Sequence, residues 1–233
     1  MTAFLAQAPT SYQWIWGHRG NILHLLLQHA EITAIALVVG LAISLPLALL
    51  AYRFGAAYGP IAAFAGLLYT IPSLALFAIF TPITGLTILT AEIGLVSYTL
   101  LILIRNIVAG LRGVPEDVKE AARGMGHSPR QLLWRVELPL ALPAIVAGVR
   151  VATVSTIGLV TVAGLIGKGG LGQLIVDGLR ILYPTEILTG AILSFFFALI
   201  IDRLLLLGER SLTPWARRAR VRDWIPPRKL EVL

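Results

Sequence analysis

The sequence predicts an all-α integral membrane protein with about five transmembrane helices. Of its 233 residues, 57% are hydrophobic and only 13% are charged, which is about half the charged fraction of an average soluble domain. The mean hydropathy is +0.84, so there are too few polar side chains to cover so apolar a core in water. Long uncharged runs separate the charged residues, as in chains whose helices cross a bilayer.

The uncharged runs place the spans along the chain. Residues 32–52 form a run of 21 residues without a charge, which is long enough to cross the hydrocarbon core as a helix. The next run, 54–91, is too long for one crossing. We expect a second span over 60–80 and then an apolar loop, with a re-entrant turn or an extra crossing in 54–91 as the alternative. The remaining spans are expected over 86–111, 140–166 and 187–207.

The charged segments orient these spans. Residues 112–139 carry five basic and four acidic side chains, and the tail 208–233 carries seven basic and three acidic ones. Because positive charge favours the cytoplasmic side, both segments are expected in the cytoplasm, and the N-terminus is expected outside. Residues 1–31 are expected to form an external segment with a short interfacial helix over 21–31. The basic tail is typical of a flank that meets anionic lipid rather than nucleic acid.

The polar residues do not favour catalysis or a metal site. The chain has no cysteine and four histidines, and His24 and His29 miss the i, i+4 spacing that places two metal ligands on one helix face. Residues 167–172 fit G-x-G-x-x-G, but the strand that must precede a dinucleotide site is missing. No G-x-x-x-x-G-K-[ST] motif occurs, so any ATP must bind another chain.

The glycines of 167–172 have two interpretations. One is a mobile external gate, and the other is a tight turn between a span and a short helix. The residues assigned to the gate are Gly167, Gly169, Gly170 and Gly172.

Polar residues and prolines inside the spans indicate a path for a solute. Pro72 removes a backbone hydrogen bond, and transporters hold substrates where broken helices expose carbonyl groups. A packing kink is the alternative. The residues expected along the path are Tyr69, Thr70, Pro72, Ser73, Tyr98 and Asn106. The charges of Arg105, Arg150 and Asp202 are expected to snorkel to the membrane surface or to pair.

Residues 113–139 are expected to form two short helices joined by a bend. Pro115 followed by two acidic residues is typical of a helix start, and Gly126 ends that helix. Ser128 is the N-cap of the second helix, which stops at Pro139. An exposed helix pair between two spans is suited to docking a partner rather than to chemistry.

The docking loop resembles a known family. The run Glu120-Ala121-Ala122-x-x-x-Gly126, followed after nine residues by Val136-x-Leu138-Pro139, resembles the EAA loop of ABC importer permeases. Residues 32–207 as a whole resemble a type I, MetI-like transmembrane domain. The resemblance implies that the first loop helix sits in a groove of a cytoplasmic ATPase subunit. The residues it assigns to ATPase coupling are Glu120, Ala121, Ala122, Gly126 and Pro139.

Further residues are similar to the osmoprotectant branch of these permeases, which carries glycine betaine, choline or carnitine. They are the run 70–77, Arg105-Asn106 and the glycines of 167–172, although Lys168 stands where a small residue is expected. A permease for an amino acid such as methionine is the alternative within the family. A transporter driven by an ion gradient is the rival from another class, but the sequence lacks the midplane acids and internal repeat that it needs.

The resemblance also implies partners and a location. This chain would bind no cofactor, because ATP and magnesium would sit on the ATPase subunits. The other partners would be a second permease, identical or homologous, and an extracytoplasmic solute-binding protein. The complex would lie in the cell membrane of a bacterium or archaeon.

Overall fold

The computed structural model describes residues 11–215, which form helices and no strand. The first ten residues and most of the expected basic tail lie outside this range. The elements are α2 (Ser11–Gly17), α3 (Arg19–Arg53), α4 (Gly55–Thr70), α5 (Ser73–Thr84), α6 (Ile88–Arg112), α7 (Glu116–Gly124), α8 (Pro129–Leu132), the π-helical turn η1 (Leu133–Glu137), α9 (Leu138–Ala163), the 3₁₀ turn η2 (Gly164–Ile166), α10 (Leu171–Arg180) and α11 (Pro184–Leu212).

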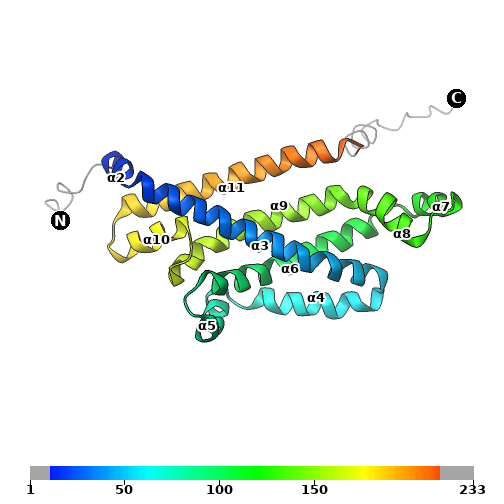
Figure 1. Cartoon of the computed structure of the whole chain (residues 1–233), viewed down its shortest axis with the longest axis horizontal. Coiled ribbons are helices and arrows are strands. Elements are labelled where there is room, and N and C mark those ends of the chain that lie inside the picture. Colours follow the sequence, from blue (N-terminus) through cyan, green and yellow to red (C-terminus); the bar gives the residue numbers. More distant parts are fainter. Residues whose placement is uncertain (1–10, 216–233) are drawn as a thin grey trace, which may run out of the picture.

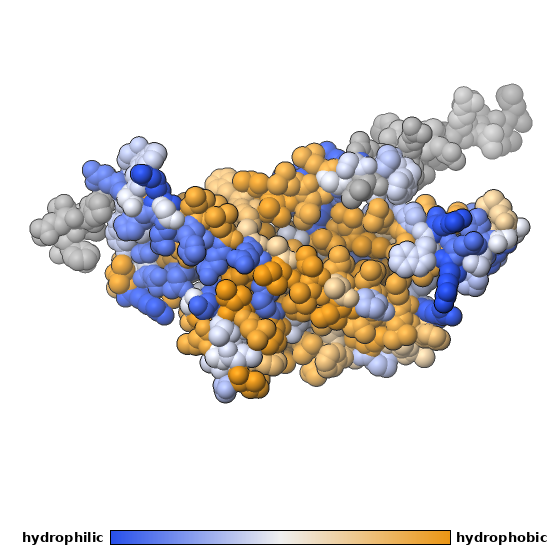
Figure 2. Space-filling view, in the orientation of Figure 1, coloured by the Kyte–Doolittle hydropathy of each residue, from blue (hydrophilic) through white to orange (hydrophobic). Residues whose placement is uncertain are grey.

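The long helices lie side by side along the longest axis of the molecule (Figure 1). Helices α7 and α8 lie at one end, which we call the loop end, and α2 and α10 lie at the other, which we call the glycine end. Hydrophobic side chains cover the surface between two hydrophilic ends (Figure 2). Within residues 11–215, four helices are long and apolar enough to cross a membrane, and the pair α4–α5 raises the number to five if it is one span. This arrangement confirms the expected fold class.

Helix α6 is the centre of the bundle, because it packs against α3, α4, α5 and α9. Small residues allow the close approach. A Cβ added to Gly40 of α3 would lie 2.0 Å from Oγ1 of Thr99, and one added to Gly148 of α9 would lie 2.4 Å from Cβ of Asn106. Small residues at helix contacts are typical of membrane bundles, where van der Waals packing replaces the hydrophobic effect.

The segment expected as a span over 60–80 is not one continuous helix. The chain breaks between α4 and α5, and the two helices meet at an angle of 91°. Pro72 has no N–H and disfavours the helical conformation of the residue before it, and Ile71 is extended, with φ −67° and ψ 126°. The break is compatible with one bent span and also with the re-entrant turn given as the alternative.

The expected interfacial helix over 21–31 is not a separate element. Helix α3 starts at Arg19 and continues without a break to Arg53. No proline interrupts its first turns, and its buried face already begins with Leu25 and His29. His29 is completely buried, and its Nε2 lies 3.1 Å from the carbonyl oxygen of Ile157 on α9. Packing against α9 therefore makes this segment part of the first long helix.

Candidate coupling loop and translocation path

Helix α7 is a nine-residue helix at the loop end (Figure 1). Pro115 is its N-cap, and Glu116 and Asp117 lie in its first turn, where negative charge interacts favourably with the helix dipole. Gly126, just beyond its C-terminus, has φ +83°, a conformation that glycine adopts without steric cost. The expected start and end of this helix are therefore found.

The inner face of α7 contacts the ends of two other elements. Lys119 and Ala122 are buried. The Nζ atom of Lys119 lies 5.9 Å from the ring centroid of Tyr52, near the end of α3. The Tyr52 hydroxyl donates a hydrogen bond of 2.9 Å to Oε1 of Glu137 in η1. A chain of polar contacts thus joins α7, α3 and η1.

Charge pairing within α7 fixes the direction of the Lys119 side chain. Glu116 accepts a hydrogen bond of 2.8 Å from Nη1 of Arg123 and lies 3.2 Å from Nζ of Lys119. The bond from Arg123, followed by that from Lys119, lowers the pKa of Glu116 below its usual value of 4.5. Burial alone would lower the pKa of Lys119, but the Glu116 carboxylate and the Tyr52 hydroxyl outweigh it, so the pKa is raised. Lys119 is therefore charged at neutral pH.

The outer face of α7 is exposed and partly apolar. Val118, Glu120 and Ala121 are exposed, and the side chain of Met125 is 73% exposed. Among the residues assigned to ATPase coupling, Glu120, Ala121 and Gly126 lie on this surface. Ala122 does not, because it is 2% exposed and packs toward the bundle. Ala122 therefore occupies an inner packing position, and its assignment as a partner contact stays a prediction.

The expected helix end at Pro139 is wrong. Ser128 does cap α8, in a capping box with Gln131, but the chain then passes through η1 directly into α9. Pro139 lies in the first turn of α9. A wider π turn just before a proline relieves the clash between its ring and the carbonyl four residues earlier. Pro139 is therefore part of a continuous helix and is partly buried.

Two tyrosines, one on α4 and one on α6, lie beside the break between α4 and α5. The rings of Tyr69 and Tyr98 meet edge to face, with centroids 5.4 Å apart. The Tyr98 hydroxyl donates a hydrogen bond to the carbonyl oxygen of Ile71, the residue just before the proline that breaks the helix. Tyr98 is buried, whereas Tyr69 is 42% exposed. The tyrosine pair thus fixes the break from the side of α6.

The other residues assigned to the path lie at different places. Thr70 and Pro72 are exposed at the break and Ser73 is partly buried there, and the Thr70 hydroxyl donates to the carbonyl of Leu67 in its own helix. Asn106 is eight residues, or about 12 Å, further along α6 than Tyr98. It packs against Gly148 of α9 and donates from Nδ2 to the carbonyl of Ile102. The structure therefore groups five of the six residues and separates Asn106.

The glycines at 167–172 form a closely packed turn at the glycine end. A Cβ on Gly169 would lie 2.0 Å from the nitrogen of Gly164, one on Gly170 would lie 2.6 Å from Cβ of His29, and one on Gly172 would lie 2.2 Å from the oxygen of Thr161. Gly167 has open space around it but adopts φ +73°. This geometry matches the alternative of a tight turn, and the gate stays a prediction.

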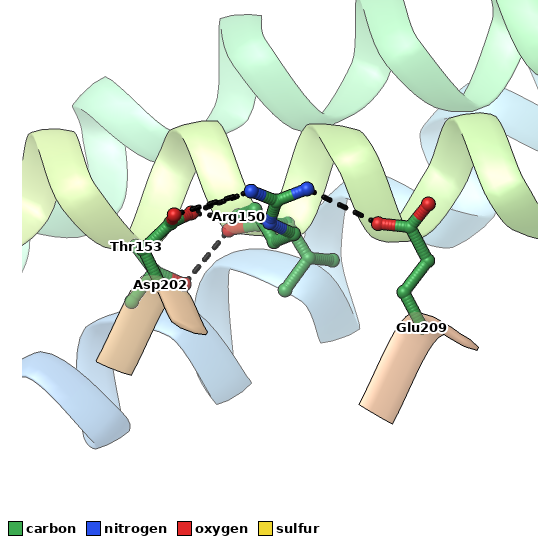
Figure 3. A network of polar contacts seen from close by, with 5 residues as sticks. Arg150, Thr153, Asp202 and Glu209 are labelled. Carbon is green, nitrogen blue, oxygen red and sulfur yellow. Dashed lines mark hydrogen bonds and ion pairs between the residues drawn. The ribbon is translucent and has the colours of Figure 1, made fainter. Parts of the chain in front are cut away.

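Three charged side chains of the long helices form one cluster (Figure 3). Arg150 of α9 donates to Asp202 of α11, with its Nη2 2.9 Å and Nε 3.1 Å from Oδ1, and to Oε2 of Glu209 at 3.2 Å. Asp202 lies ten residues before the end of α11, so it is a pairing group and not a terminal charge. Pairing is therefore confirmed for Arg150, with partners on the last helix rather than in the loop. Arg105 is exposed on α6, and its snorkelling stays a prediction.

Comparison with known proteins decides the family. Residues 21–214 match the family described as binding-protein-dependent transport system inner membrane component. The chain belongs to this family. It is 37% identical to the choline transport system permease protein OpuBB of Bacillus subtilis over 202 residues, which are 87% of this chain and 93% of the relative. It is 36% identical over 195 residues to the glycine betaine/carnitine/choline transport system permease protein OpuCB of the same organism, covering 84% and 90% of the two chains.

The fold agrees with that of a solved transporter. An inward-facing structure of the MetNI methionine ABC transporter superimposes with a TM-score of 0.77 at 23% identity, over 84% of this chain and 98% of the other. This likeness shows the MetI-like fold. The permease is thus a multi-pass membrane protein, and the expected EAA loop is the segment that contains α7.

Several residues of the contact network were not assigned from the sequence. Tyr52, Lys119 and Glu137 lie far apart in the chain, and only the folded bundle brings them together. Glu209 was missed although a signal exists, because it follows Asp202 by seven residues and so lies on the same helix face. A search for acidic pairs at that spacing would have found the partners of Arg150.

Proposed function

We propose that this permease is the membrane-spanning subunit of an ATP-driven importer of quaternary-amine osmoprotectants such as glycine betaine, choline or carnitine. The observation that carries the proposal is identity of 37% with a choline transport permease along 87% of the chain. The residues around the break at Ile71–Pro72 support it. They include the partly exposed ring of Tyr69, and aromatic rings attract quaternary ammonium groups.

The loop end would receive the driving force. The outer face of α7, with Val118, Ala121 and Met125, is the surface that we assign to a groove of the ATPase subunit, which binds ATP and magnesium. Lys119 on the inner face then transmits movement of α7 to Tyr52 at the end of α3. Through the bond from Tyr52 to Glu137, the same movement reaches η1 and the start of α9.

The proposal includes the sidedness of the chain. The loop end, with its basic residues, would lie in the cytoplasm, and the glycine end would face the solute-binding protein outside. A second permease copy, or a homologous permease, would complete the path. Because the chain has no cysteine, Met125→Cys and Arg180→Cys each introduce one thiol at opposite ends. A membrane-impermeant maleimide should label Arg180→Cys in intact cells and Met125→Cys only after lysis, and the reverse pattern would refute this orientation.

Reconstituted uptake tests the substrate. The permease, its ATPase and its binding protein in proteoliposomes should accumulate labelled choline or glycine betaine only when ATP is supplied to the ATPase. Excess unlabelled carnitine should compete, and methionine should not. Competition by methionine alone would favour the amino-acid alternative. Uptake that follows an ion gradient without ATP would contradict an ABC importer.

Paired substitutions test the role of α7. Met125→Glu places a charge on the outer face, and Ile181→Glu places the same charge on a side chain that is 65% exposed at the glycine end. Met125→Glu should lose the ATPase subunit during purification in mild detergent, and Ile181→Glu should retain it. Equal retention by both variants would remove α7 from the interface.

A further inference from the structure

A cavity of about 780 Å³ opens at the loop end, between the last turns of α3 and the segment that contains α8 and η1. Its apolar wall includes Leu49, Leu50, Phe54 and Leu133. Leu50 is 45% exposed and Phe54 is 54% exposed, so these side chains form an open groove rather than a closed core. The groove lies where the first long helix ends, which is the boundary of the apolar band.

The polar part of the groove is basic. Three guanidinium groups, those of Arg53, Arg123 and Arg130, line it against the single carboxylate of Glu137. Glu137 is 5% exposed, and its Oε1 accepts the hydrogen bond from Tyr52. The charge of Arg123 is partly balanced by Glu116, 2.8 Å away. Positive charge therefore exceeds negative charge on the lining.

Two of the arginines are available to an anion. Within residues 11–215, neither Arg53 nor Arg130 forms an ion pair. The guanidinium of Arg53 lies 5.7 Å from the ring centroid of Phe54, which holds it above the apolar wall. Guanidinium groups bind phosphate through paired N–H donors. The groove thus places a phosphate-binding group directly beside a surface suited to an acyl chain.

We propose that this groove binds one anionic phospholipid of the cytoplasmic leaflet. Its phosphate lies between Arg53 and Arg130, and an acyl chain covers Leu50 and Phe54. The site rests on the proposed sidedness, because anionic headgroups lie at the cytoplasmic surface, where each basic residue adds to the attraction. The bound lipid bridges α3 and α8, so it links the membrane bundle to the segment that follows α7.

Native mass spectrometry of the purified permease–ATPase complex tests this site. The complex is titrated with phosphatidylglycerol and with phosphatidylcholine of the same chain length, and the lipid adducts are counted. Removing one basic charge by Arg53→Gln or Arg130→Gln should weaken the phosphatidylglycerol adduct about fivefold, and removing both about twenty-fivefold, as expected for one charge at an anionic surface. The matched control Arg180→Gln removes an exposed arginine at the glycine end and should change nothing.

The competing outcomes are distinct. Equal binding of the two lipids, or a double variant that retains the adduct, overturns the site. An adduct on the isolated permease that is lost when the ATPase binds shows that the ATPase covers the groove, and this also overturns it. Displacement by millimolar inorganic phosphate would assign the arginines to free anions instead. The adduct is counted without ATP or solute, so the site fails or stands independently of the uptake experiment.

Discussion

The glycine end and the loop end both turn the chain at glycines, but the surroundings of these glycines differ. At the glycine end, Gly169, Gly170 and Gly172 lie against backbone atoms at distances that leave no room for a side chain. At the loop end, a Cβ added to Gly124 or Gly126 would meet no neighbouring atom within 4 Å, and Gly126 requires glycine only because of its φ of +83°. The same residue type therefore serves packing at one end and backbone geometry at the other.

Because of this difference, we expect substitutions at the glycine end to change the stability of the fold and substitutions at the loop end to change coupling. A turn that fills its space with backbone contacts holds α3, α9 and α10 together, so changes there act on the folded state. A turn that is surrounded by open space contributes little packing, so changes there are expected to act on the ATPase that we propose docks against it. Substitutions at the two ends should therefore differ in what they change, and the largest effects are expected where the packing is tightest.

The largest effect is expected at Gly170. Gly170→Ala should destabilise the permease by about 2–5 kcal/mol, because a side chain at positive φ costs about 1–2 kcal/mol and overpacking against His29 costs about 1–3 kcal/mol more. Thermal unfolding in detergent measures the change. The control is Gly158→Ala, in helix α9 with open space at its Cβ position, which should leave the midpoint unchanged or raise it slightly. Equal midpoints for the two variants would contradict the packed turn.

The ion cluster should give the next largest effect, because its three side chains are mostly buried between α9 and α11. Arg150→Met leaves Asp202 and Glu209 without their cation and should destabilise the protein by about 3 kcal/mol, the lower part of the range for buried pairs. The lower part applies because 22–25% of each side chain is exposed. The triple variant Arg150→Met, Asp202→Leu, Glu209→Leu should recover most of the loss, since no charge is left unpaired. A triple variant less stable than the single one would show that the ion pairs themselves stabilise the fold.

A smaller effect on stability, but a large one on uptake, is expected at Gly126. Gly126→Ala strains one exposed turn by about 1–2 kcal/mol, and this strain should tilt α7 rather than unfold the bundle. ATP-driven uptake should fall several-fold while the unfolding midpoint moves little. Gly126→Asn should restore most of the uptake, because asparagine tolerates the left-handed conformation. Wild-type uptake by Gly126→Ala would mean that α7 does not need this turn.

The smallest effect is expected at Glu116, which is exposed on α7. Arg123 and Lys119 lower its pKa, so its contribution to holding α7 is fully present above its usual value of 4.5 and is lost as the pH falls through the lowered value. Glu116→Gln should speed amide hydrogen exchange in residues 116–126 at neutral pH. The difference from the wild type should vanish once the pH falls below the lowered value. A difference that persists in acid would point to a shape effect of the substitution instead of charge.

Composition and local pattern predicted the fold class and the position of the loop that contains α7. These features depend on residues close together in the chain. Uncharged runs of fixed length identify spans, and the run from Glu120 to Gly126 with its proline and serine caps identifies the loop. The proline at 72 also marked an irregular helix. The angle of the break was not predictable, since it depends on how Tyr98 of α6 holds the carbonyl of Ile71.

Only the tertiary structure decided which faces these elements present. It turned Ala122 inward, joined Lys119 to Tyr52, continued the helix through Pro139 and brought Arg150 to Asp202 and Glu209. It also set the glycines of 167–172 against His29 and the end of α9. The physical reason is shared by most of these contacts. Apart from the helix through Pro139, which depends on the local π turn, each one joins residues far apart in sequence. A local pattern gives the side of a helix on which a residue lies but not the neighbour that this side meets.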